Sequence, residues 1–459
     1  MRKNIDMLQG PLFKGILSFA IPVILTNLLQ ILFNTADLIV VGQYCGSISV
    51  AAVSATTTLT HLIVNFFIGF SVGTGVAVAR SLGGQQVDAV RRTVHTAIPT
   101  AIICGALISL IGVIFAPTFL AWMGTPGNVL PLSSVYMRIY FSGMIFNMVY
   151  NFSASILRAA GETKLPLFFL TIAGVVNVGL NVFFVTVFKM NVAGVALATT
   201  ISQAVSAVMA VIALTRRTDA CRLTIKKMRI QMKELARIIR LGLPAGIQSS
   251  LFAVSNVIIV SSINSFGSEA IISGNGAASN LEGLLSSVTS GFYTTQVNYI
   301  GQNSGAHKFV RVRKIYFTCL ACMAAVVISI SALVFLFRTP LLSLYITDNP
   351  EAITHGITRM TFLNLFYVFL GCMDSTTGAL RGLGYSLIPM FITLLGACGL
   401  RIAWVYTVFQ IPKCHTLGCL YQSFPISWIV TFLVEITLFL LILRKKIRTE
   451  KSLPQRSAI

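Results

Sequence analysis

Apolar residues occur along the whole chain in long stretches, and short polar segments separate each stretch from the next. A helix needs about 20 mostly apolar residues to cross a bilayer. Stretches of about that length or longer lie near residues 14–37, 51–79, 93–116, 133–156, 166–188, 192–214, 238–263, 277–300, 315–337, 357–378, 386–410 and 419–443. The pattern therefore predicts an all-α polytopic membrane protein with twelve transmembrane helices.

Composition supports a membrane protein. Of the 459 residues, 55% are hydrophobic and 10% are charged, whereas an average soluble protein carries roughly 25% charged residues. A water-soluble surface needs more charged residues than this chain has. Lipid must therefore contact much of the protein surface. The nine cysteines lie mostly within apolar stretches. We expect them to be small buried side chains rather than a disulfide framework or a metal site, and we expect no cofactor.

The net charge of +21 is distributed unevenly over the loops. Both termini and every second loop hold 28 of the 34 lysines and arginines, and the opposite loops with their adjoining spans hold the other six. By the positive-inside rule, we expect both termini to be cytoplasmic. Anionic membrane lipid is then the expected partner of these charges, and nucleic acid is not.

The two halves of the chain repeat each other. Arg158 and Arg381 are 223 residues apart, as are Gly161 and Gly384, and Pro166 and Pro389. Six spans per half give both halves the same orientation, an arrangement found in transporters that carry a cavity between the halves. We expect an N-lobe at 1–214, a basic cytoplasmic linker at 215–237, a C-lobe at 238–443 and a basic cytoplasmic tail at 444–459.

Polar side chains inside predicted spans are the candidate functional residues. Asn27, Gln30, Asn34 and Asp37 share one face of the first helix, because they are spaced three, four and three residues apart. Lipid would not tolerate such a stripe, whereas a water-filled vestibule would. The alternative is that the amides only bind neighbouring helices.

Other spans add further polar residues and acids: Asn147, Asn151, Asn177, Asn181, Thr199, Asn256, Glu282, Asp374 and Glu435. A buried carboxyl group can bind and release a proton, which provides ion coupling without a nucleophile or a metal. Two alternatives stay open: Arg401 on the next helix could neutralise Asp374, and Glu435 could be structural because it lies close to the basic tail.

The sequence lacks the motifs of several other functions. There is no GxxxxGK[ST] phosphate loop, so the chain has no ATPase site, and there is no HExxH or GxSxG signature. A flippase for lipid-linked oligosaccharides would need a groove lined by Arg and Lys, and Arg401 alone lies at membrane depth. A membrane-embedded lipid-modifying enzyme would need a cluster of His, Asp or Ser, which five scattered histidines do not supply.

Several motifs together resemble the multidrug and toxic compound extrusion (MATE) family, in particular its Gram-positive members. They are Ala36-Asp37-Leu-Ile-Val-Val-Gly42, Gly73-Thr-Gly75, Leu157-Arg-Ala-Ala-Gly-Glu-Thr-Lys-Leu-Pro166, Gly194-Val-Ala-Leu-Ala-Thr199, Leu241-Gly-Leu-Pro244, Gly301-Gln-Asn-Ser-Gly-Ala306 and Leu380-Arg-Gly-Leu-Gly384. The resemblance covers essentially the whole chain. It implies two six-helix bundles around a central cavity and a monomeric antiporter that exports cationic or amphipathic organic compounds in exchange for H⁺ or Na⁺.

The resemblance also assigns site residues. Asp37 matches the acid in the first helix of the family, and Asn177, Asn181 and Thr199 match the positions that surround the coupling cation. Many members have aspartate where this chain has Asn181, and one carboxylate fewer favours H⁺ over Na⁺ at this site. We expect Glu282 and Asp374 to be candidates in the second lobe. The residues expected to line the substrate cavity are Gln30, Asn34, Asn147, Asn151 and Asn256.

Overall fold

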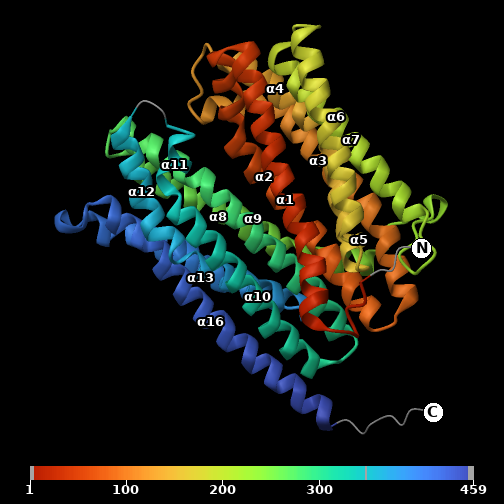
Figure 1. Ribbon diagram of the computed structural model, residues 1–459. Helices are drawn as coiled ribbons and strands as arrows, with labels where there is room; N and C mark the ends of the chain where they lie inside the picture. Colours follow the sequence, from red (N-terminus) through yellow and green to blue (C-terminus); the bar gives the residue numbers. More distant parts are fainter. Residues whose placement is uncertain (1–4, 347–348, 453–459) are drawn as a thin grey trace. The chain divides into compact units, whose positions relative to one another are not determined.

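The computed structural model describes residues 5–346 and 349–452, and most of these residues are helical (Figure 1). No β-strand occurs in this part of the chain. The α-helices are α1 (Leu12–Cys45), α2 (Ser47–Gly83), α3 (Val87–Trp122), α4 (Leu130–Ser142), α5 (Met144–Ala159), α6 (Lys164–Thr186), α7 (Asn191–Thr215), α8 (Met232–Asn264), α9 (Glu269–Gly305), α10 (Phe309–Leu336), α11 (Arg338–Ser343), α12 (Pro350–Asn364), α13 (Tyr367–Gly382), α14 (Leu387–Thr393), α15 (Leu400–Tyr406) and α16 (Leu417–Ser452).

Most of these helices coincide with predicted spans. Within the described residues, nine helical segments are long and apolar enough to cross a membrane, and the bent pair α12–α13 raises this number to ten. The predicted stretches near 133–156 and 277–300 also fall on helices, on α4 with α5 and on α9, but these are not among the ten. The break between α4 and α5 lies at Gly143, where a Cβ atom would be 2.9 Å from the Thr200 side chain.

Internal contacts divide the chain into two compact units. The first contains Leu25–Ser250 and Ile5, and the second contains Asp6–Ile24 and the chain from Leu251 onward. Helices α1 and α8 therefore each contribute their first part to one unit and their second part to the other. The sequence analysis placed the boundary between the lobes at the linker, residues 215–237, before α8. The contacts place this boundary within α8, after Ser250.

In the first unit, glycines allow α2 and α8 to approach closely. Gly69 and Gly73 are four residues apart on α2, and Gly242 and Gly246 are four apart on α8. A Cβ atom at Gly69 would lie 2.3 Å from the Gly246 amide nitrogen, and one at Gly73 would lie 2.4 Å from the Ile238 carbonyl oxygen. Such small-residue pairs bring membrane helices into backbone contact, since no side chain stands between them.

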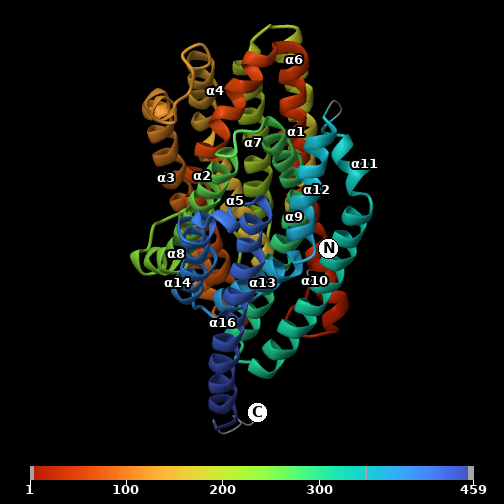
Figure 2. The same cartoon turned by 90° about the vertical axis from the view of Figure 1, so that its left-hand side faces the viewer.

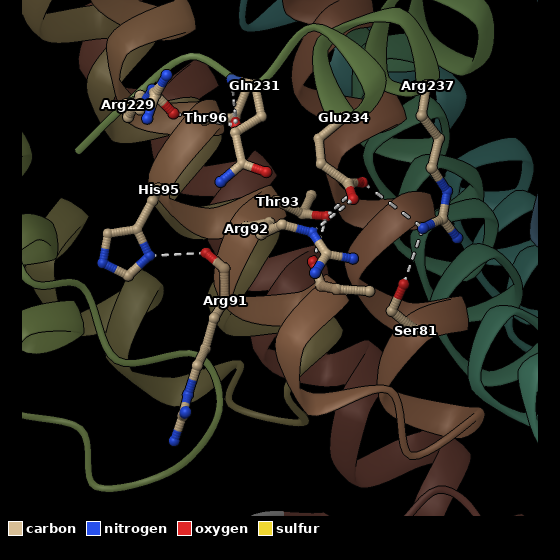
Figure 3. A network of polar contacts seen from close by, with 11 residues as sticks. Ser81, Arg91, Arg92, Thr93, His95, Thr96, Arg229, Gln231, Glu234 and Arg237 are labelled. Carbon is tan, nitrogen blue, oxygen red and sulfur yellow. Dashed lines mark hydrogen bonds and ion pairs between the residues drawn. The ribbon is translucent and has the colours of Figure 1, made fainter. Parts of the chain in front are cut away.

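The segment that enters α8 is bound to the start of α3, also within the first unit (Figure 3). Glu234, in the first turn of α8, is buried and accepts hydrogen bonds from Arg92 Nε at 3.3 Å and from Thr93 Oγ1 at 3.2 Å. Thr96 Oγ1 accepts from the Gln231 amide and donates to the Arg229 carbonyl. Part of the predicted linker is therefore structured and attached to α3.

The second unit is organised around α9. This helix packs against α10, α12 and α13, and α16 lies along α12 and α13 (Figure 1). The span predicted at 386–410 is one helical run of three parts, α14, a π-helix at Leu394–Gly399 and α15. The hydrogen bonds of a π-helix span one residue more than those of an α-helix, and π-helices are rare, so this segment is a local irregularity of the second unit.

Candidate ion-coupling site

Asp37 lies in the first unit at the centre of a small polar cluster from α1, α6 and α7. The Asn181 amide nitrogen donates to Asp37 Oδ1, and Thr199 Oγ1 donates to Asp37 Oδ2 at 3.3 Å. Asn177 is joined to both neighbours, since its amide nitrogen donates to Thr199 Oγ1 and its oxygen accepts from Asn181 Nδ2, each at 3.3 Å. The structure thus brings together the four residues that the family resemblance assigns to one site.

Local sequence explains this arrangement. Asn177 and Asn181 are four residues apart on α6, so they share one face of that helix. One turn before Asn177, Gly174 carries no side chain, and a Cβ atom there would lie 1.7 Å from the ring of Phe33. Phe33 is one turn before Asp37 on α1, so the contact of its ring with Gly174 sets the two helices at the distance at which Asp37 meets the amides.

The cluster contains a carboxylate and no positive charge. Asp37 is 7% exposed and Asn181 is fully buried, and within the described residues no Lys, Arg or His forms an ion pair with Asp37. In addition, Asn181 Oδ1 is buried and has no hydrogen-bond partner among the residues that the structure describes. Buried acceptors normally have a partner, and an uncompensated buried carboxylate is expensive. The site therefore has the chemistry of a binding site for a proton or a small cation.

An apolar cluster borders the site on the side towards the end of α1. Val40 and Val41, which follow Asp37 on α1, belong to the same buried cluster as Val185 of α6 and Val192 and Val195 of α7. Apolar packing at this end keeps the carboxyl group away from bulk water.

Two tyrosines near the site were not among the predicted residues. Tyr136 and Tyr140 of α4 are four residues apart, their rings are stacked with centroids 6.0 Å apart, and both are close enough to Asp37 to interact with its charge. Their spacing on one face of the predicted fourth helix was a readable signal. The contact between Phe33 and Gly174 could not be predicted, because no sequence pattern indicates which glycine a given aromatic ring will contact.

The predicted cavity residues have varied surroundings. Gln30, Asn34 and Asn256 are exposed. Asn147 and Asn151 are half-buried and bonded to each other on α5, with Asn151 Nδ2 donating to the Asn147 side chain and carbonyl at 2.9 Å. Their assignment to a substrate cavity stays a prediction.

The two acids predicted for the second lobe differ from each other. Glu282 of α9 forms a bidentate ion pair with the buried Arg359 of α12, at 2.9 and 2.7 Å. Asp374 of α13 accepts a hydrogen bond from Thr289 Oγ1 at 3.2 Å. Arg401, the alternative partner considered for Asp374, instead donates to Ser427 Oγ at 2.9 Å. Glu282 is thus neutralised in place, and Asp374 is held by a hydroxyl group.

Comparison with known proteins agrees with the repeat and with the fold. The family model described as MatE matches residues 22–183 and again residues 244–407. The chain is 27% identical over 401 residues to the probable multidrug resistance protein YpnP of Bacillus subtilis, covering 87% of this chain and 89% of that protein. It is 26% identical to the probable multidrug resistance protein YoeA of the same organism, with 93% of each covered.

Solved structures show the same architecture. A crystal structure described as MATE in the bent conformation superimposes with a TM-score of 0.90 at 20% identity, covering 98% of this chain and all of the other. At this identity the likeness shows the fold alone. The predicted all-helical polytopic membrane fold is confirmed.

Proposed function

This chain belongs to the MatE family of membrane transporters, and from that membership we propose that it is a secondary antiporter that exports cationic or amphipathic organic compounds. Export is coupled to uptake of H⁺, or of Na⁺, at Asp37. The relatives in Bacillus subtilis, which are named as probable multidrug resistance proteins, support the substrate class. The bacterial relatives support a location in the inner (cell) membrane of a bacterium, and the basic residues of alternate loops support cytoplasmic termini. We propose that the monomer is the working unit.

The observation that carries the proposal is the buried carboxyl group of Asp37 with neutral hydrogen-bond partners on α6 and α7. Binding of a proton would convert the Asp37 carboxylate to a neutral carboxylic acid, whose hydroxyl group needs a hydrogen-bond acceptor. Rotation of the Asn181 amide by half a turn would offer its oxygen, which has no partner in the structure, to that hydroxyl. The same set of residues can therefore accommodate both charge states, with a change of side-chain conformation between them.

The ion we favour is H⁺. Sodium sites are built from several oxygen ligands, and carboxylates contribute most of the attraction, because hard cations prefer charged oxygen. Asn181 supplies a neutral amide where a second carboxylate would strengthen such a site. One carboxylate with two amides and a hydroxyl is sufficient to hold a proton.

Helix α1 provides the mechanical link in this proposal. It carries Asp37 in the first unit, and its first part carries Phe19, whose ring packs on Tyr299 in the second unit with centroids 5.7 Å apart. Pro22 lies on α1 between Phe19 and Asp37. A proline inside a helix removes one backbone hydrogen bond of the preceding turn, which permits bending. A change of charge at Asp37 that repacks α1 near Pro22 would therefore alter the packing of this helix in both units.

Coupling requires that cation and exported compound favour different conformations, since a ligand can shift an equilibrium only by its difference in affinity. In the cycle we propose, ion binding at Asp37 expels the compound and favours return to the inward-open state. An electrogenic step can draw about 2.3 kcal/mol per charge for each 100 mV of membrane potential.

Efflux from intact cells tests the role of Asp37. Asp37→Asn keeps the shape and removes the charge, so we expect cells that express it to accumulate a fluorescent cation as fully as cells without the transporter. Glu351→Gln, at an exposed acid on α12, should retain efflux and is the matched control. Efflux by Asp37→Asn at the wild-type rate, at equal membrane expression, would remove Asp37 from the scheme.

The flippase alternative draws no support from the arginines at membrane depth. Arg359 is occupied by Glu282. Arg401 is 1% exposed and lies over the rings of Phe424 and Trp428. A groove for a pyrophosphate-linked lipid would need free cationic side chains, so we retain drug export as the proposal.

A further inference from the structure

The second unit contains a buried acid that the proposed cycle does not use. Glu435 of α16 is 0% exposed. Thr377 Oγ1 of α13 donates to its two carboxyl oxygens at 2.9 and 3.0 Å, and Thr393 Oγ1 of α14 donates to one of them at 3.1 Å. Figure 2 shows the three helices in the same region of the second unit. Among the described residues, no Lys, Arg or His forms an ion pair with Glu435.

Glu282 shows what a structural acid at similar burial looks like in the same unit. It is 7% exposed, and Arg359 balances its charge through two short hydrogen bonds. Glu435 is more completely buried, and within the described part of the chain its hydrogen-bond donors are hydroxyl groups. Acids inside membrane helices that lack a basic partner commonly serve in proton or ion transfer, because a permanently charged group would be too costly there.

The helix opposite Glu435 is irregular at the point of contact. Thr393 ends α14 and directly precedes the π-helix Leu394–Gly399. Within it, a Cβ atom at Gly396 would lie 2.2 Å from Thr431 Oγ1, and Thr431 is one turn before Glu435 on α16. π-Helical turns occur frequently at functional sites, and this one is pressed against the turn of α16 that carries the acid.

A second acid, Asp374, lies on the same helix as Thr377 and interacts electrostatically with Glu435. Asp374 is half-buried and lies three residues before Thr377 on α13, so the two share a face of the helix. The charged and titratable groups that face Glu435 are Asp374 and Arg381 on α13 and Tyr316 on α10. Asp374, which is half-buried, is thus within electrostatic range of the fully buried Glu435, and Thr377, which donates to Glu435, lies one turn after Asp374 on α13.

From this geometry we propose that Glu435, held by Thr377 and Thr393, is a second proton-binding site that is loaded through Asp374. The proton leaves the Asp374 carboxyl group, which becomes a carboxylate, and joins the Glu435 carboxylate, which becomes the acid. No bond other than O–H forms or breaks. The proposal rests on the proposed antiport function and extends it, because a second site raises the number of protons exchanged for each exported molecule.

Two measurements on the full-length protein in proteoliposomes test this inference. Infrared difference spectra recorded across a pH series should contain a protonated carboxyl band that depends on pH and is absent in Glu435→Gln. Thr377→Val keeps the acid and removes one hydroxyl donor, so it should move that band even if Glu435→Gln is poorly folded. Glu351→Gln, which removes an exposed carboxyl group, should leave the band in place.

The second measurement is the number of protons moved per exported cation, obtained from the pH gradient at which net transport reverses. We expect this number to fall in Glu435→Gln and to stay unchanged in Glu351→Gln. A pH-independent band at Glu435, or an unchanged proton number, would overturn the inference. If the wild-type protein moves no cation in response to any pH gradient, the proposed function itself fails, which is a separate outcome.

Discussion

Three of the buried acids, one on α1, one on α9 and one on α16, have three different environments. Asp37 has two neutral donors from α6 and α7, Glu282 has Arg359, and Glu435 has two threonine hydroxyls. A carboxylate buried with an arginine can remain charged, whereas one buried with neutral donors gains much by binding a cation. The hydrogen-bond partners of each acid, more than its burial, therefore distinguish Asp37 and Glu435, which we propose to exchange ions, from Glu282, which stabilises the fold.

Asn181→Asp should increase the response to sodium. The new carboxylate would stand beside Asp37, where two charges together attract Na⁺ and each disfavours ionisation of the other in its absence. We expect the apparent Na⁺ affinity, measured as Na⁺-stimulated transport in proteoliposomes at fixed pH, to rise on the order of tenfold, which corresponds to about 1.4 kcal/mol. Asn151→Asp on α5 is the control for an added charge elsewhere. Equal Na⁺ responses in the two variants would contradict the assignment.

Arg359→Met should destabilise the protein strongly. It leaves Glu282 buried without a cation, and breaking one side of a buried pair typically costs about 3–5 kcal/mol. The double variant Glu282→Gln/Arg359→Met removes both charges and should regain most of this loss. Unfolding midpoints in detergent measure both effects. If the double variant is as unstable as the single one, the pair does not hold the second unit as described.

At the residue scale, the sequence predicted the members of the Asp37 site through a family resemblance and through spacing on one helix. It did not predict that Arg359 binds Glu282, because these residues are 77 positions apart and no periodic pattern links them. Arg401 was considered as a partner of Asp374 because it lies on the next predicted helix. The structure directs its guanidinium to Ser427 and to aromatic rings instead.

Most helices lie where hydrophobic length predicts them, and two predicted spans are interrupted. One predicted span is divided at Gly143, and another is bent by 46° between α12 and α13. Hydrophobicity indicates that a segment lies in the membrane, but a bend depends on which neighbour packs against it. The π-helix at Leu394–Gly399 was likewise not predictable, since hydrophobic length does not specify the hydrogen-bond pattern within a helix.

Gly73→Ala tests the close approach of α2 and α8 in the first unit. The added Cβ atom would meet the backbone of Ile238 and Gly242 at 2.4 and 2.6 Å, so the helices must separate. We expect a loss of about 1–3 kcal/mol in stability, as for other overpacked sites. Gly179→Ala adds the same atom to α6, where nothing lies within 4 Å, and should be neutral or slightly stabilising. Thermal midpoints that fall equally would argue against the packing described for α2 and α8.

For the whole molecule, the internal repeat was the most informative feature of the sequence. The offset of 223 residues predicted two related halves, and the family model matches the chain twice, once in each half. The repeat did not predict that α1 and α8 each belong to both units. Short-range patterns cannot specify which part of a long helix packs on which neighbour, because that choice depends on contacts such as Gly291 with Ile24.

The central claim is that one carboxyl group, Asp37, exchanges a cation for the exported compound. Uptake of a fluorescent cation into everted membrane vesicles, with a pH gradient and a Na⁺ gradient imposed separately, tests it most directly. We predict that the wild-type protein takes up the fluorescent cation when the vesicle interior is acidic, and takes up less or none with a Na⁺ gradient alone. Asp37→Asn should take up none under either gradient. Uptake by Asp37→Asn equal to that of the wild type under the pH gradient would contradict the account.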